Sequence, residues 1–193
     1  MAYIPRLDDT GMLNNIHWYS IQNPYYATGY GMPNCTAYAW GRFWEIGDPL
    51  SGGLNVPTHL PGYWDGQLWF QKAIDDGTYE TGQVPALGAV ICFTGGSAGH
   101  VAIVEEINSD GTIVTSNSAY GGPYFYTQTL SPSNNYSWTS AGGNLYTLQG
   151  FIYNPFGDNP PTPTFRRNKF PWVLYARKFR ERNRHWFLKE NMI

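Results

Sequence analysis

The chain of 193 residues is long enough for one domain with a buried core, or for one domain and an appendage. Aromatic residues make up 17% of it and charged residues 13%, which excludes a disordered acidic or basic protein. Two cysteines are too few for a disulfide-stapled scaffold, and without a CxxC motif they form no zinc pattern; Cys35 and Cys92 could still pair, but nothing in the sequence favours it. The N-terminus lacks the pattern of a signal peptide and no window reaches about 18 apolar residues, so we expect a soluble protein made in the cytoplasm.

The net charge of −2 conceals an acidic body and a basic tail. Residues 1–164 hold three Lys and Arg against twelve Asp and Glu, whereas residues 165–193 hold nine against two. Such asymmetry suggests that the tail meets an anionic partner.

Two helices are predicted in the first half of the chain. Residues 1–30 are polar and rich in Asn and Tyr, without a clear period. Asn34 is a good N-cap, and residues 35–46 after it show helical spacing before a Gly-Asp-Pro break. Residues 63–75 are predicted to form the second helix, which ends at Asp76-Gly77.

The second half of the chain is typical of strands. An Asp-Gly pair in the turn 108–111 is the strongest short signal for a β-hairpin. Strand-like segments lie before and after it, at 84–93, 99–107, 112–119, 124–130 and 145–155. Helices followed by an antiparallel meander define an α+β domain.

Prolines divide the chain into three parts. We expect a domain at 1–155, a stiff Pro-rich linker at 156–165 and a basic tail at 166–193. Aromatic residues of the tail recur at helical spacing with Arg and Lys between them, which predicts a basic amphipathic helix.

Cys35 stands where the first predicted helix begins, directly after a loop that contains Gly31, Pro33 and Asn34. Free N–H groups and the helix dipole stabilise a thiolate at such a place, so we expect a lowered thiol pKa. A nucleophilic cysteine also needs a histidine that takes its proton and a third group that holds the histidine ring.

His100 is the histidine that begins a predicted strand, and it follows the small-residue run GGSAG. We expect the glycines of that run to leave room for a substrate beside the imidazole: Gly95, Gly96 and Gly99. Across the predicted hairpin, residue 100 falls opposite about residue 118 or 119. Asn117 is therefore the candidate that orients the His100 ring.

Other conspicuous residues receive structural interpretations. Cys92 lies within the apolar run VICF and is typical of a core strand. Glu105 and Glu106 are expected at a solvated strand end, with Glu105 a minor alternative as the group that orients His100. Four tryptophans at helical spacings favour a core over a sugar platform: Trp40, Trp44, Trp64 and Trp69.

Four blocks in order, NCTAYAWGR, GQVPALGAVICF, GHVAIVEEI and TSNSAYGG, resemble the CHAP family of cysteine- and histidine-dependent amidohydrolases and peptidases that cut bacterial peptidoglycan. The resemblance covers about residues 25–155. It implies a papain-like α+β fold of the CHAP and NlpC/P60 kind, with Cys35 as nucleophile and His100 as base. The third position in this family is commonly Glu; here Asn117 takes that place and is a weaker electrostatic partner for an imidazolium.

The same resemblance bears on metals and partners. Some phage members bind calcium through aspartates before the nucleophile, but the stretch NPYYATGYGMPN has no acidic residue, so we infer no metal and no cofactor. The implied partner is bacterial peptidoglycan. For the tail an anionic wall polymer, a membrane surface and another protein all stay open, and no fold motif supports nucleic-acid binding.

The sequence thus predicts a peptidoglycan hydrolase that cuts an amide bond with Cys35, His100 and Asn117, either a muramoyl-alanine amidase or a stem or cross-bridge endopeptidase. We expect a phage endolysin or virion-associated lysin, made in the host cytoplasm without a signal peptide and acting on the wall after release, or carried in the particle. Two alternatives are a non-catalytic wall-binding or phage tail module, and a cysteine protease that cuts proteins.

Overall fold

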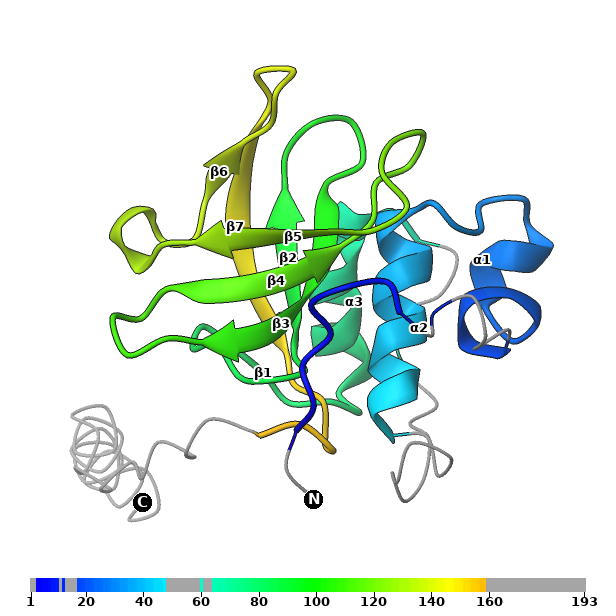
Figure 1. Ribbon diagram of the computed structural model, residues 1–193, viewed down its shortest axis with the longest axis horizontal. Helices are drawn as coiled ribbons and strands as arrows, with labels where there is room; N and C mark the ends of the chain where they lie inside the picture. Colours follow the sequence, from blue (N-terminus) through cyan, green and yellow to red (C-terminus); the bar gives the residue numbers. More distant parts are fainter. Residues whose placement is uncertain (1–2, 11, 13–16, 48–59, 61–63, 159–193) are drawn as a thin grey trace, which may run out of the picture. The chain divides into compact units, whose positions relative to one another are not determined.

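The computed structural model describes residues 3–10, 12, 17–47, 60 and 64–158 (Figure 1). The helical elements are the π-helix η1 (His17–Ile21), α1 (Pro24–Ala27), α2 (Cys35–Gly47), α3 (Gly66–Asp76) and the 3₁₀-helix η3 (Pro132–Asn134). The strands are β1 (Thr81–Gly82), β2 (Val90–Thr94), β3 (His100–Ile107), β4 (Ile113–Asn117), β5 (Tyr126–Leu130), β6 (Trp138–Thr139) and β7 (Leu145–Ile152).

Both predicted helices are found, each with the expected end signal. Asn34 caps α2, because its Oδ1 accepts hydrogen bonds from the backbone N–H of Thr36 at 3.1 Å and from the Thr36 hydroxyl at 2.9 Å. α3 ends at Gly77, whose φ of 70° is left-handed and whose N–H donates to the carbonyl of Ala73. The cap at Asn34 fixes the place where α2 begins, and therefore the place of Cys35.

The sheet is antiparallel throughout, with the strand order β1-β7-β2-β3-β4-β5 and with β6 paired to β7. The strands β2 to β5 form the expected meander. β7 departs from it, because this last strand returns to pair with both β1 and β2 (Figure 1). Phe151 and Ile152 of β7 are fully buried, as in a strand with neighbours on either side.

Alternation along the strands creates two cores, one on each face of the sheet. One core joins the helices to strand residues that include Val90, Cys92, Val101 and Ile103. The other gathers residues that include Ile91, Phe93, Ala102, Val104 and Phe151. Cys92 is fully buried, as predicted.

The tryptophans divide between core and surface. Trp69 is fully buried and Trp40 nearly so, which confirms the core interpretation for these two. Trp44 is partly buried and packs against Trp40, with ring centroids 4.9 Å apart. The interpretation is wrong for Trp64, which is 45% exposed and lies 4.2 Å from the ammonium group of Lys72.

Helices packed on an antiparallel sheet confirm the α+β, papain-like fold class predicted from the sequence. None of the described helices is long and apolar enough to cross a membrane. The linker predicted at 156–165 lies outside the described residues beyond position 158, and the whole tail at 166–193 lies outside them. The predicted domain division therefore stays a prediction.

Candidate active site

Cys35 is the first residue of α2 and is partly exposed. Its side chain packs against the core beneath the helices, and its sulfur faces the backbone N–H of Val101. Val101 follows His100 directly in β3. The structure thus brings the start of α2 to the start of β3, across more than sixty residues of sequence.

Burial controls the acidity of this thiol. It raises the pKa of Cys35 to about 11, and the N–H groups of Val101, Thr36 and Cys35 itself lower it only in part. The lowered thiol pKa expected from the helix N-terminus is therefore wrong for the resting protein. The helix contributes the expected N–H groups, but desolvation outweighs them.

His100 begins β3 and is held from several sides. Its ring lies 5.6 Å from the ring of Trp138 and 6.0 Å from that of Tyr146, which are themselves stacked at 4.3 Å between centroids. A Cβ placed on Gly66, the first residue of α3, would lie 3.1 Å from the backbone carbonyl carbon of His100. Aromatic packing and the close approach of α3 fix this imidazole on a rigid element.

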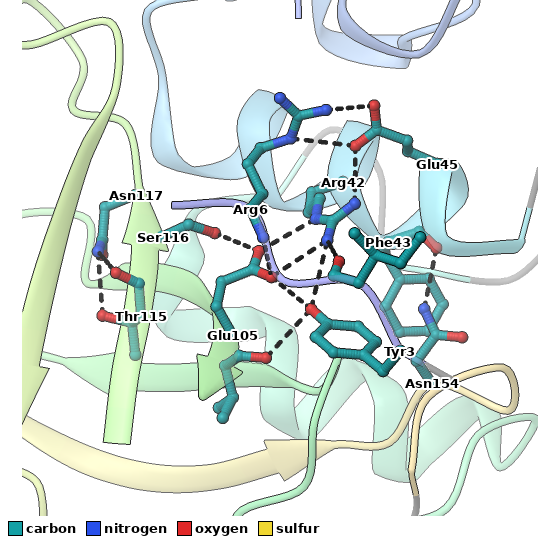
Figure 2. Close-up of polar contacts among 12 residues, drawn as sticks. Tyr3, Arg6, Arg42, Phe43, Glu45, Glu105, Thr115, Ser116, Asn117 and Asn154 are labelled. Atoms are coloured by element: carbon teal, nitrogen blue, oxygen red, sulfur yellow. Dashed lines mark hydrogen bonds and ion pairs between the residues drawn. The ribbon is translucent and has the colours of Figure 1, made fainter. Parts of the chain in front are cut away.

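The Nε2 of His100 lies 3.0 Å from Oδ1 of Asn117, as the hairpin register predicted. The amide orientation follows from its other contacts, because Nδ2 of Asn117 donates to the carbonyl oxygen of Thr115 at 3.1 Å and to its Oγ1 at 3.0 Å (Figure 2). An amide oxygen can only accept, so Nε2 must carry the proton. In the neutral imidazole, Nδ1 is then the nitrogen that can act as a base.

Burial lowers the pKa of His100, and the hydrogen bond that His100 donates to Asn117 raises it only in part. Together with the raised thiol pKa, this shift favours a neutral thiol and a neutral imidazole in the resting protein. Such a pair can act by general-base catalysis, in which the proton leaves the sulfur as the sulfur attacks.

Two of the three glycines before His100, Gly95 and Gly99, do not leave room for a substrate, contrary to the expectation from the sequence. A Cβ on Gly95 would lie 2.1 Å from the carbonyl oxygen of Leu145, and one on Gly99 would lie 2.5 Å from the N of Gln67. That space is already filled by the backbone of β7 and α3. The glycines are needed because these elements approach the turn so closely.

Glu105 is not at a solvated strand end, because it is only 1% exposed. It is also not the group that orients His100, since its carboxylate contacts Arg42 of α2 and Ser116 of β4 instead. Glu105 sits at a β-bulge in β3, and its ion-pair partner is 63 residues away in sequence. Neither feature has a signal in the local sequence.

Sequence reasoning also missed three side chains around His100. Thr115 could have been found, because it lies two positions before Asn117 and so on the same face of β4. Trp138 and Tyr146 had no such signal, because β6 and β7 reach His100 only through the tertiary fold. Among the described residues, no three His, Cys, Asp or Glu side chains gather as a metal site would require.

Comparisons with known proteins assign the segment that contains this site. Residues 25–119 match the model of the CHAP domain. The chain is 35% identical over 117 residues to a probable autolysin, SsaALP, of Staphylococcus aureus. This match covers 60% of this chain and 38% of the relative. It is 33% identical over 94 residues to the N-acetylmuramoyl-L-alanine amidase sle1 of Staphylococcus epidermidis. This match covers 48% of this chain and 27% of the relative.

A crystal structure of an N-acetylmuramoyl-L-alanine amidase from Staphylococcus aureus matches with 25% identity and a TM-score of 0.43, over 62% of this chain and 33% of that chain. The chain spans less than half the length of each of these relatives. Fold and family match define an α+β protein in which a helix start carries Cys35 and two neighbouring strands carry His100 and Asn117. The segment 25–119, which contains Cys35, His100 and Asn117, is similar to the CHAP domain family.

Proposed function

We propose that this chain is a peptidoglycan hydrolase that cuts an amide bond by a thiol mechanism. The observation that carries the proposal is the hydrogen bond between His100 and Asn117, 3.0 Å long, which leaves Nδ1 as the base. The sulfur of Cys35 faces the N–H of the residue next to His100. The autolysin and amidase names of the relatives support peptidoglycan as the substrate.

In the proposed reaction, Nδ1 of His100 takes the thiol proton while Sγ of Cys35 attacks the carbonyl carbon of the amide. The resulting oxyanion meets the backbone N–H of Cys35, which has no partner within the helix at this first position. The intermediate collapses, the imidazolium donates its proton to the leaving nitrogen, and a thioester remains. His100 then activates a water that releases the acid and restores the thiol. Asn117 holds the ring throughout.

Digestion of purified murein tests the proposal and identifies the bond. We expect soluble fragments whose new ends, found by mass spectrometry, show one bond class. Free L-alanine amino termini would indicate a muramoyl-alanine amidase, whereas new ends within the stem or cross-bridge would indicate an endopeptidase. Casein serves as the control substrate. Casein cleavage with intact murein would favour the protease alternative, and cleavage of neither would favour a wall-binding or tail module.

The pH dependence of the reaction should reveal the role of Asn117. His100 must be neutral to act as a base, and because burial lowers its pKa we expect kcat/KM to hold down to below pH 6.5. The hydrogen bond that His100 donates to Asn117 raises that pKa, so Asn117→Ala should move the acid limb to still lower pH. It should also reduce kcat/KM about 10- to 100-fold, since the ring loses its fixed tautomer.

Asn108→Ala is the control for this measurement, because Asn108 lies in the exposed hairpin turn at the far end of β3. Its profile should match that of the unaltered protein. A profile of Asn117→Ala with the same acid limb and the same rate would contradict the orienting role.

The phage origin, the site of action and the partner of the tail stay proposals. We propose a phage endolysin or virion-associated lysin whose basic tail contacts an anionic wall polymer, a membrane surface or another protein. Residues 166–193 carry the positive charge on which the tail proposal depends.

A further inference from the structure

A buried cluster of charges lies between α2 and the sheet (Figure 2). Arg42 of α2 holds Glu105 of β3 in a two-pronged contact, with Nε to Oε1 at 3.0 Å and Nη2 to Oε2 at 3.1 Å. Its third nitrogen, Nη1, lies 2.9 Å from Oε2 of Glu45. A guanidinium held in this way has little freedom to shift, because both prongs require one geometry.

The N-terminal segment completes the cluster. The backbone N–H of Arg6 donates to Oε2 of Glu105 at 2.8 Å, and the Arg6 guanidinium pairs with Glu45. The Tyr3 hydroxyl donates to the same Glu105 oxygen, and Nη2 of Arg42 donates to the carbonyl of Ile4 at 2.7 Å. Residues 3–6 therefore supply hydrogen-bond and ion-pair partners to the charged side chains of α2 and β3.

The cluster connects the same three elements that carry the candidate active site. Cys35 and Arg42 share α2, and His100 and Glu105 share β3. β4 carries Asn117, and its preceding residue Ser116 donates to Oε1 of Glu105 at 2.7 Å. One carboxylate thus contacts every element that supplies a candidate catalytic side chain.

The charges of the cluster balance, with two guanidiniums and two carboxylates. Burial would raise the pKa of Glu45, but the guanidiniums of Arg42 and Arg6 outweigh it and hold that pKa below its usual value. Buried ion pairs stabilise a fold no better, as a rule, than well-packed apolar residues of similar volume. Because burying four charges costs desolvation free energy, the cluster is better explained by the geometry that it fixes than by a gain in the free energy of unfolding.

We infer that Glu105 is a positioning residue, which holds α2, β3 and β4 in register so that Cys35 meets His100, and that residues 3–6 take part in this function. The inference rests on the proposed thiol mechanism. Glu105 is assigned no direct part in the chemistry, because its buried carboxylate is engaged by Arg42, Ser116 and residues 3–6.

Glu105→Gln tests the inference, with Glu106→Gln as the matched control. The two residues are neighbours in β3, but Glu106 is partly exposed and Glu105 is buried. Rates on purified murein are divided by the concentration of folded protein, which is measured by circular dichroism. We expect kcat of Glu105→Gln to fall about tenfold with KM within twofold, and Glu106→Gln to keep both. A merely structural role would lower the folded fraction and leave kcat per folded molecule unchanged, and that result would overturn the inference.

Tyr3→Phe keeps the test decisive if Glu105→Gln does not fold. This change removes one hydroxyl from Glu105 and keeps the ring, whose centroid lies 5.7 Å from the Arg42 guanidinium. We expect kcat per folded molecule to fall about two- to threefold, and an unchanged kcat would overturn the role of residues 3–6.

Cys35→Ala in the same assay separates the two proposals. If that variant is active, the thiol mechanism fails; if it is inactive while the Glu105 and Tyr3 variants match Glu106→Gln, only the inference fails.

Discussion

Replacing Cys35 by alanine should abolish the hydrolysis of purified murein, with a loss of at least about a thousandfold in kcat/KM. A nucleophile has no substitute in a covalent mechanism, and what remains comes from substrate binding and the oxyanion donor alone. The fold should survive, because the residue is partly exposed and the change removes one uncharged side-chain group without adding any atom. Release of soluble fragments measures the activity, and circular dichroism measures the fold.

Cys92 provides the control for this experiment. It is fully buried in β2, and burial raises its thiol pKa even further than that of Cys35, so it is inert in the folded protein. Cys92→Ala should stay active as long as it stays folded. Activity in Cys35→Ala, or its loss in a folded Cys92→Ala, would contradict the proposed mechanism.

Local patterns were sufficient to place the candidate active-site residues. Asn34 caps α2 as a helix signal predicts, which puts Cys35 at the helix start. An Asp-Gly turn fixes the register between β3 and β4, and counting across it brings Asn117 to His100. Each inference needed only neighbouring residues or a single hairpin, where short-range rules hold.

Errors arose wherever a distant segment decides the outcome. The sequence predicted that Glu105 is exposed to solvent. In the structure, Arg42 and residues 3–6, which are distant in sequence, contact it and bury it. The run that contains Gly95 and Gly99 suggested an open space, but the backbone of β7 and α3 lies against these two glycines. The raised pKa of Cys35 has the same origin, because desolvation depends on the whole fold rather than on the helix start.

Replacing Gly99 by alanine, in the turn before His100, should cause a large loss of stability. Gly99 has a φ of 69°, which an alanine adopts at a cost of about 1–2 kcal/mol. Its new Cβ would also lie 2.5 Å from the N of Gln67 and 2.5 Å from the carbonyl oxygen of Phe93, both of them backbone atoms. Because backbone cannot rotate away as a side chain can, α3 or the turn must move, and overpacking adds about 1–3 kcal/mol.

Gly77→Ala separates the two costs. Gly77 has a φ of 70°, nearly that of Gly99, but a Cβ there meets nothing within 4 Å. We expect this control to lose only the conformational cost, about 1–2 kcal/mol in urea unfolding, and to keep its full rate on murein. Gly99→Ala should lose about 2–5 kcal/mol, and the surviving folded protein should be slower per active site, because any shift of the turn also moves His100. Equal losses in the two variants would show that the turn yields without strain, and that the fixed imidazole position rests on its aromatic neighbours instead.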